Sequence, residues 1–350
     1  GNVAKARGRI GSLGLYGRVS VEHWTSPLLP YADNLVNLLI ADDLGTVTVN
    51  EVTRVLVPGG VAYVKSGDTW AKTAKPWPGG IDEWTHFLHD ASNNAVAADT
   101  QVGPPRRLKW ICGPLWSRSH EFTSSLCAMV SAGGRLFTIL DEGLTGVTPP
   151  SLPDRWTLVA RDAFNGVLLW KRPVAKWGAG AWKGRALRSI PPTVPRRLVA
   201  QGNRVFVTLG YDAPVSVLDA ATSETLATYE ATEGTEEIRC LQGVLLLRRG
   251  NNLVAAIDTR TGKRLWEAPG KVQRLSLAAR DGRVFYQDGP WLLCRGLSDG
   301  KELWRAPSKR PVALLVVCDR RVLLLSGREL RAVSAETGEG LWSVDAGVRR

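Results

Sequence analysis

The chain has 350 residues, of which 44% are hydrophobic and 22% are charged. This composition is typical of a folded globular protein and excludes wholesale disorder. The length suffices for two or three domains or for one large repeat array. No apolar run reaches the roughly 18 residues that span a bilayer. The net charge is +12, and residues 126–350 hold 33 basic against 22 acidic residues, which favours acidic partners or simply solubility.

The first 64 residues predict helices that alternate with strands. The pattern predicts a helix over 4–14, a strand over 18–24, a buried strand over 35–43, a helix over 50–56 and a strand over 61–64. Such alternation is typical of a parallel α/β sheet. We therefore expect a partial Rossmann-like segment over residues 1–65, followed by a Pro/Gly-rich linker over 66–84.

Two stretches of this segment carry a family resemblance. LLPYADNLVNLLIADDLG (28–45) and EVTRVLVPGGVAYV (51–64) resemble the C-terminal half of a class I S-adenosylmethionine (SAM)-dependent methyltransferase. The resemblance implies SAM as cofactor of the full-length protein and places Ile40, Ala41 and Asp42 at the cofactor crevice. The Gly-rich loop of that family would lie upstream, so we do not expect this chain to be active alone. The alternative is that these three residues merely end a strand.

A histidine-containing segment follows the linker. EWTHFLHD (83–90) spaces Glu83, His86, His89 and Asp90 so that a helix would gather them on one face, where they would suit a metal. The segment comes directly after the Pro/Gly-rich KPWPGG, however, and we favour a histidine pair that packs and hydrogen-bonds. The five cysteines include no adjacent pair and no CxxC, which indicates neither a zinc site nor a disulfide framework. The sequence singles out no catalytic residue and no metal ligand.

The rest of the chain is an internal repeat of about 40 residues. Five copies share a turn and a Leu that precedes an aromatic position, which is Trp in four of them. The copies cover residues 158–173, 215–231, 253–270, 292–307 and 330–346. The turn position is occupied by Gly166, Ser223, Gly262, Gly300 and Gly338, and the aromatic position by Trp170, Ala227, Trp266, Trp304 and Trp342. Between the copies, two β-prone runs surround a Gly or Asp turn, which indicates a second hairpin. Four strands per repeat predict the blade of a β-propeller.

Within a copy, each marked residue has a predicted structural role. Asp258 would accept hydrogen bonds from backbone N–H groups of the turn, Gly262 would supply a positive φ, and Trp266 would fill the wedge between blades. Sibling copies replace Asp258 with Gly296 and Ser334. An acid used for catalysis in each copy would not vary in this way, so we interpret the pattern as structural.

The pattern LVAAIDTRTGKRLW (253–266) resembles the repeat of the pyrroloquinoline-quinone (PQQ)-like, or quinoprotein dehydrogenase-like, propeller family. The resemblance covers residues 85–350 and implies a mainly β fold of at least five four-stranded blades. We predict blades at about 121–174, 197–231, 238–270, 274–307 and 313–347. Members of the family usually carry seven or eight blades, so the propeller looks truncated.

The function that we predict is a binding or scaffolding propeller beside a methyltransferase module. One alternative is an active methyltransferase in the full-length protein, with the propeller holding the substrate. The other is a PQQ-dependent dehydrogenase, which the family resemblance associates with calcium held by Glu and Asn side chains and with two adjacent cysteines. No residue here is singled out for PQQ or calcium. Analogy with the family favours the periplasm or cell envelope.

The longest gap between aromatic positions, from Trp170 to position 227, contains a basic stretch. Residues 163–211 hold nine basic residues and no acidic one, and two tryptophans lie among them. Lys and Arg side chains can bind an anion, and neighbouring Trp rings can stack on sugars or bases, so the pattern indicates a binding loop. Insertions in repeat arrays also often lie on the binding face. We expect an anionic polymer, a glycan or a protein as partner, not nucleic acid; the alternative is a solvated connection. The candidate ligand-binding residues are Lys176, Trp177, Trp182, Lys183, Arg185 and Arg188.

Overall fold

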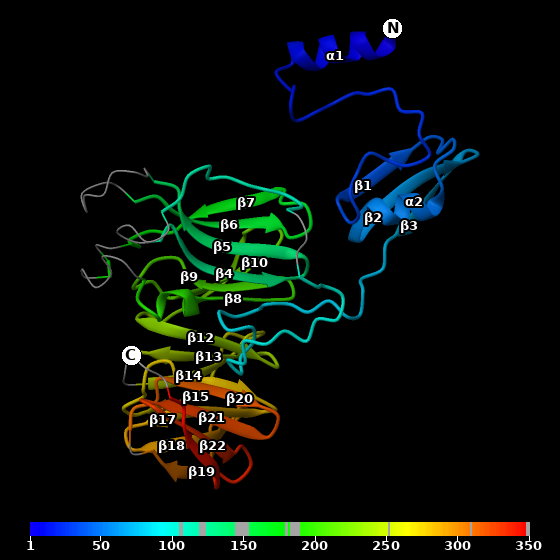
Figure 1. The fold of residues 1–350 in the computed structure, drawn as a ribbon. Helices are drawn as coiled ribbons and strands as arrows, with labels where there is room; N and C mark the ends of the chain where they lie inside the picture. The colour runs from blue at the N-terminus through cyan, green and yellow to red at the C-terminus, as the bar shows by residue number, and fades with distance from the viewer. Residues whose placement is uncertain are drawn as a thin grey trace. The chain divides into compact units, whose positions relative to one another are not determined.

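The computed structural model describes residues 1–104, 108–118, 124–143, 154–178, 181–182, 190–250, 253–308 and 310–347 (Figure 1). The chain divides into two compact units, Gly1–Pro78 and Gly79–Arg350. In the described ranges, no helix is long and apolar enough to cross a membrane.

The first unit is a small α/β arrangement. Its elements are α1 (Asn2–Ser12), β1 (Val36–Ala41), α2 (Val49–Val55), β2 (Leu56–Ser66) and β3 (Thr69–Ala74). Strands β1 and β2 pair in parallel across α2, and β3 pairs antiparallel with β2. A parallel pair with a helical crossover agrees with the predicted alternation. A three-stranded sheet with one parallel pair does not by itself establish a Rossmann-like segment, which stays a prediction.

Three predictions for this unit are wrong. Residues 18–24 form no strand, because they find no neighbouring strand and make only an isolated bridge between Tyr16 and Val19. Strand β1 is not buried: it is an edge strand, which leaves Leu38 54% and Ile40 64% exposed. Residues 69–74 of the predicted linker form β3, because a turn at Gly67 folds the chain back onto β2.

The second unit consists of five four-stranded antiparallel sheets in sequence order (Figure 1). The sheets follow the predicted repeats and make the unit mainly β. Their strands are β4 (Leu126–Ala132), β5 (Arg135–Asp141), β6 (Trp156–Asp162) and β7 (Leu168–Pro173); β8 (Leu198–Gln201), β9 (Arg204–Thr208), β10 (Val215–Asp219) and β11 (Thr225–Tyr229); β12 (Thr235–Leu241), β13 (Val244–Arg249), β14 (Leu253–Asp258) and β15 (Arg264–Pro269); β16 (Ala278–Arg280), β17 (Arg283–Asp288), β18 (Trp291–Gly296) and β19 (Glu302–Pro307); and β20 (Leu314–Cys318), β21 (Arg321–Ser326), β22 (Glu329–Ser334) and β23 (Gly340–Asp345).

The first strand of each sheet lies at a common axis. Strand β8 contacts β4 and β12, and β16 contacts β12 and β20. The sheets therefore meet along their first strands, and the fourth strands lie at the outer edge, as in a propeller-like fold. Buried residues of neighbouring sheets interleave to form the core clusters.

The repeated tryptophan closes the junction between neighbouring blades. The indole Nε1 of Trp266 donates a hydrogen bond to the carbonyl of Leu297 in the next sheet, at 2.9 Å. Its ring lies against Gly300, where an added Cβ would stand 2.6 Å from the ring. Gly300 has a φ of +66°, so the turn requires glycine for both conformation and space. Trp110, Trp170 and Trp304 make the same donation to Ala163, Ala220 and Ala335, which confirms the predicted wedge.

The aspartate that begins the turn also has its predicted role. Asp258 Oδ1 accepts hydrogen bonds from the backbone N–H groups of Arg260 and Thr261, at 3.0 and 2.7 Å. This caps the turn that carries Gly262. The marked residues of the repeat are structural.

Candidate functional site at the propeller axis

One segment of the chain fills the axis of the second unit. Residues 84–92 bind the first strand of every sheet, and each strand donates one backbone N–H. The donor–acceptor distances are 2.7 to 3.0 Å. The backbone N–H groups of the strands donate in the following pairs: Ser131 N to Trp84 O, Ala200 N to Thr85 O, Cys240 N to His86 Nε2, Ala279 N to Ala91 O and Val317 N to Ser92 O. We call residues 84–92 the axial segment.

The two histidines of this segment have different partners. His86 is 2% exposed and accepts from the backbone of Cys240. Burial, with Arg239 and His89 nearby, holds the pKa of His86 well below its usual value, so the ring is neutral and suited to accept. His89 instead lies 2.7 Å from a carboxylate oxygen of Asp82. Both histidines are therefore hydrogen-bonded within the chain, as we favoured for this pair.

The metal-site alternative for EWTHFLHD fails on geometry. The segment is not helical, because His86 and His89 form a β-bridge instead. The carboxylate of Glu83 accepts a hydrogen bond from the backbone N–H of Gly133 at 2.6 Å. Within the described residues, no three His, Cys, Asp or Glu side chains gather as a metal site would require.

An arginine cluster lies beside the axial segment. Glu237 is fully buried, and its carboxylate lies 3.5 Å from Arg239 and Arg248 and 3.9 Å from Arg196. Asn93 Oδ1 accepts from Arg239 at 2.8 Å and from Arg196 at 3.3 Å. Burial and the neighbouring Arg196 lower the pKa of Arg239 to about 9, against the opposing effect of Glu237.

The charges of this cluster do not fit calcium. Glu237 and Asn93 are residue types that would suit calcium, but their oxygens already face guanidinium groups. A cation added there would be repelled by the arginines. The axial segment lies beside the cluster and is hydrogen-bonded to the first strand of each of the five sheets. The residues present therefore serve as a structural hub.

The predicted ligand-binding residues are only partly brought together. Lys176 is exposed and lines a cavity of about 710 Å³ with Trp177, Tyr211 and Asp212. Trp177 is 5% exposed and Trp182 is 1% exposed, and both belong to the core beside β4 and β8. The expectation of exposed stacking surfaces is therefore not met by these rings, because they pack against each other with centroids 6.5 Å apart.

Two other basic residues of this stretch, Arg196 and Arg197, differ from the expectation of an open cationic loop. Lys183, Arg185 and Arg188 lie outside the described residues. Arg196 and Arg197 are 3% and 2% exposed. They belong to the interior and are not available to a surface anion.

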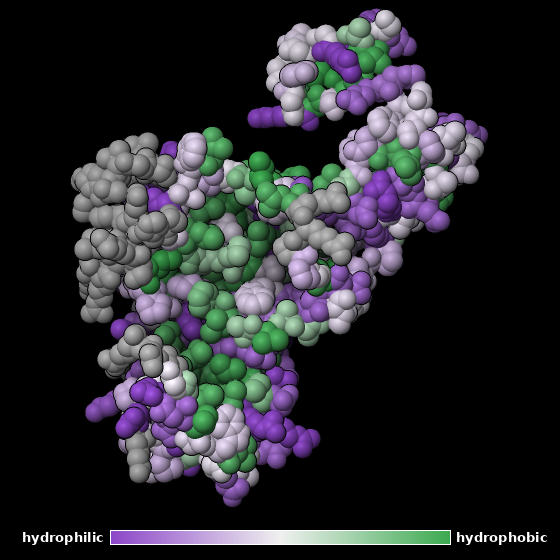
Figure 2. Space-filling model, in the orientation of Figure 1, coloured by the Kyte–Doolittle hydropathy of each residue, from purple (hydrophilic) through white to green (hydrophobic). Residues whose placement is uncertain are grey.

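An apolar groove lies next to the axial segment. Its lining includes Trp84, Phe87, Leu126, Met129 and Pro195, and its volume is about 590 Å³. Leu126 and Met129 are 42% and 50% exposed on strand β4. Figure 2 shows hydrophobic side chains gathered over the part of the second unit that carries β4 and β5. Sequence reasoning missed this groove, since its residues come from three distant segments.

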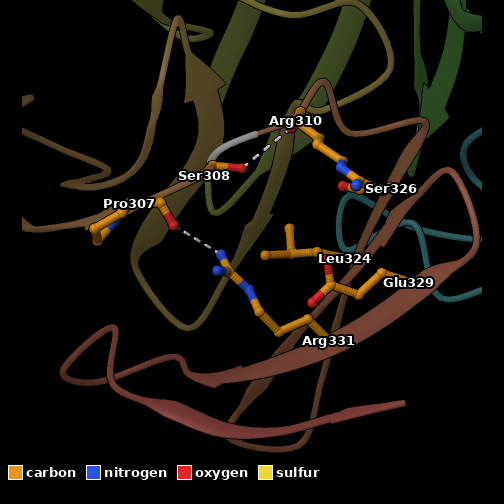
Figure 3. A pocket seen from close by; sticks show the side chains of 7 residues that line it. All are labelled: Pro307, Ser308, Arg310, Leu324, Ser326, Glu329 and Arg331. Carbon is orange, nitrogen blue, oxygen red and sulfur yellow. Dashed lines mark hydrogen bonds between the residues drawn. The ribbon is translucent and has the colours of Figure 1, made fainter. Parts of the chain in front are cut away.

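A smaller pocket lies between the fourth and fifth sheets (Figure 3). Its volume is about 370 Å³, and Arg331 points across it to donate to the carbonyl of Pro307 at 3.0 Å. Ser308 bonds to the carbonyl of Arg310 on the same side. The side chains of Arg331 and Ser308 are therefore already hydrogen-bonded within the chain.

In the first unit, the predicted crevice residues lie at the end of β1. Ile40 and Ala41 are the last residues of this strand, and Asp42 follows. Ile40 and Ala41 line a cavity of about 490 Å³ with Tyr31 and Asp43. Asp42 is not among the residues that line this cavity, and the assignment of the three residues to a cofactor crevice stays a prediction.

The sheets, the axis and the repeated Trp–Gly junctions define a propeller-like repeat protein. A family model described as "Outer membrane protein assembly factor BamB" (PQQ_2) matches residues 155–288 and 250–349. The chain therefore belongs to this family of PQQ-like repeat proteins. No curated protein matches the chain.

Solved structures show a similar fold. A europium-containing methanol dehydrogenase aligns with a TM-score of 0.53 and 13% identity, over 75% of this chain and 58% of that one. BamB from Moraxella catarrhalis aligns at 0.43 and 17%, over 64% and 61%. The quinohemoprotein alcohol dehydrogenase from Comamonas testosteroni aligns at 0.47 and 12%, over 76% and 49%. The chain spans less than two thirds of each of these proteins, and at this identity the likeness concerns the fold alone.

Proposed function

We propose that the propeller-like unit is a binding or scaffolding module for a protein partner. The observation that carries this proposal is the exposed apolar groove beside β4, with Leu126 and Met129 at its edge. Exposed apolar patches of this kind are typical of interaction surfaces. The arginine cluster supports the same proposal, because the oxygens of Glu237 and Asn93 already face guanidinium groups. Membership of the BamB family supports a role at the cell envelope or in the periplasm.

The test against the dehydrogenase alternative is direct. PQQ and calcium are added to the purified chain, and absorbance and dye reduction are followed with primary alcohols as substrates. We expect no absorbance shift and no dye reduction beyond the free cofactor, with a quinoprotein dehydrogenase as the positive control. Alcohol-dependent dye reduction by the chain would overturn the proposal.

We further propose that the basic stretch binds an acidic partner, which it contacts at the cavity lined by Lys176 and Trp177. A variant with Lys176, Lys183, Arg185 and Arg188 changed to Gln should elute from heparin and from an acidic polysaccharide column at lower salt. The control changes four exposed basic residues elsewhere, namely Lys263, Lys271, Lys301 and Arg328, for the same loss of charge. Equal elution of the two variants would leave only a general charge effect and contradict a site.

We also propose that residues 1–65 are part of a SAM-dependent methyltransferase module in the full-length protein. The parallel β1–β2 pair and the cavity at the end of β1 support this. Titration calorimetry with SAM provides the test. Weak binding that Asp42→Ala removes would support the crevice assignment, and the absence of heat at millimolar SAM would contradict it.

A further inference from the structure

One blade junction lacks the tryptophan that closes the others. At the junction between the second and third sheets, the aromatic position is held by Ala227, which is exposed. Tyr229, two residues later on β11, partly replaces the indole. Its hydroxyl lies 3.3 Å from the carbonyl of Thr259, and its ring is 3.4 Å from the place of a Cβ on Gly262.

This replacement leaves an open groove. Its volume is about 580 Å³, and its floor consists of Ala227, Tyr229, Ala255 and Ile257. Gly262 is exposed there, whereas the equivalent Gly166 and Gly338 are buried and Gly300 is half-buried. The turn glycine that other junctions cover with an indole is thus exposed to solvent beside the Tyr229 ring.

The molecule itself shows which group fits such a surface. At the other junctions, the indoles of Trp266 and Trp304 lie on the turn glycines Gly300 and Gly338. The geometry of the same turn recurs at Gly262, with a φ of +70° against +66° at Gly300. A flat aromatic side chain is therefore the group to which this turn is shaped.

The charges at the rim indicate what accompanies the aromatic group. Arg264 is already paired with Glu267 at 2.6 Å. Arg249, Arg260 and the exposed Glu230 also line the groove. Neither Arg249 nor Arg260 has a carboxylate within 4 Å in the part of the chain that the structure describes, so the rim keeps an excess of positive charge. An aromatic anchor with acidic neighbours would complement this rim.

We propose that the groove between the second and third sheets binds a tryptophan side chain flanked by acidic residues on a partner polypeptide. This deepens the proposed binding function and rests on it, and it names a site separate from the groove beside β4. The partner's indole would take the place that the repeat leaves empty at Ala227, with its face on Gly262 and Tyr229.

The test uses the pentapeptide Glu-Gly-Trp-Gly-Glu with 5-fluorotryptophan, observed by fluorine NMR as the full chain is added. We expect a shift that saturates at about millimolar concentration, as a single anchor would give. Ala227→Trp, which fills the groove with the chain's own ring, should weaken binding by about tenfold or more. The neighbouring Leu226→Trp adds the same ring to exposed position 226 and should leave binding unchanged.

The melting temperatures of both variants verify that they fold, and Ala227→Leu serves as a second groove-filling variant. A peptide shift that is absent with the native chain, or equal for the native chain and the folded groove-filled variants, would overturn the proposal. Either result leaves the dye-reduction outcome untouched, so failure of this site is distinguishable from failure of the proposed function.

Discussion

Two junctions of the same repeat differ in how they are closed. Between the third and fourth sheets, Trp266 covers Gly300 and donates to Leu297 O at 2.9 Å. Between the second and third sheets, Tyr229 reaches Gly262 only at 3.4 Å and leaves a groove beside Ala227. The turns are alike, so the difference lies in one side chain. The repeat thus keeps its fold although one junction lacks its tryptophan and contains a groove.

The largest expected effect comes from removing the closed wedge. Trp266→Ala deletes a ring that is 9% exposed together with its hydrogen bond. Loss of such a buried aromatic typically lowers the free energy of unfolding by about 3–5 kcal/mol. Urea denaturation of the full chain measures this. Trp342→Ala is the matched control: Trp342 is 44% exposed on β23, and we expect a loss of under about 1 kcal/mol. Equal losses would contradict the wedge role.

A smaller effect separates the two turn glycines. In Gly300→Ala the new Cβ would stand 2.6 Å from the Trp266 ring, so a clash adds to the cost of a positive φ, for a total of about 2–4 kcal/mol. In Gly262→Ala the Cβ meets Tyr229 at 3.4 Å, an ordinary contact, so only the φ cost of about 1–2 kcal/mol remains. Thermal denaturation of both variants gives the comparison. A Gly262 variant as unstable as the Gly300 variant would show that its junction is equally tight.

The smallest effect is a pH dependence at the turn of the third sheet. The N–H and hydroxyl of Thr261 hold the pKa of the Asp258 carboxyl below its usual value, outweighing burial. The charged form therefore stabilises the fold above the unfolded pKa of about 4, and this contribution is lost as the pH falls through the lower folded pKa. Asp258→Asn keeps an acceptor but does not titrate. We expect the urea midpoint of this variant to be lower than that of the native chain at pH 7 and to approach it at pH 3. A difference that stays constant with pH would contradict the link between Asp258 ionisation and stability.

The repeat made much of the fold predictable. Gly262, Trp266 and their equivalents recur at a fixed spacing, and each acts on its direct neighbour, so one copy's chemistry predicts the next. Strand predictions without a repeat were weaker: residues 18–24 have the alternation of a strand but no partner to pair with. Pairing is a property of the whole sheet, and local pattern does not specify it.

The candidate sites were less predictable than the sheets. Trp177 and Trp182 lie in a Gly-rich basic stretch, and nothing in their spacing indicated that they pack into the core. The axial hub joins residues such as Asn93 and Arg239, which are 146 positions apart, and a single sequence carries no signal for such a contact. The groove at Ala227 did leave a signal. A missing tryptophan in a regular repeat marks the place where a junction is open.

The axial segment also has a consequence for how the second unit folds. In most repeat arrays each unit contacts only its neighbours, so the units can form or melt one after another. Here Asn93, directly after the axial segment, donates to the carbonyl of Leu315, 222 residues further along, and the segment itself binds all five first strands. Contacts of such high sequence separation slow folding and make each sheet's stability depend on the others. A single short peptide thus converts an additive series of blades into one cooperative unit.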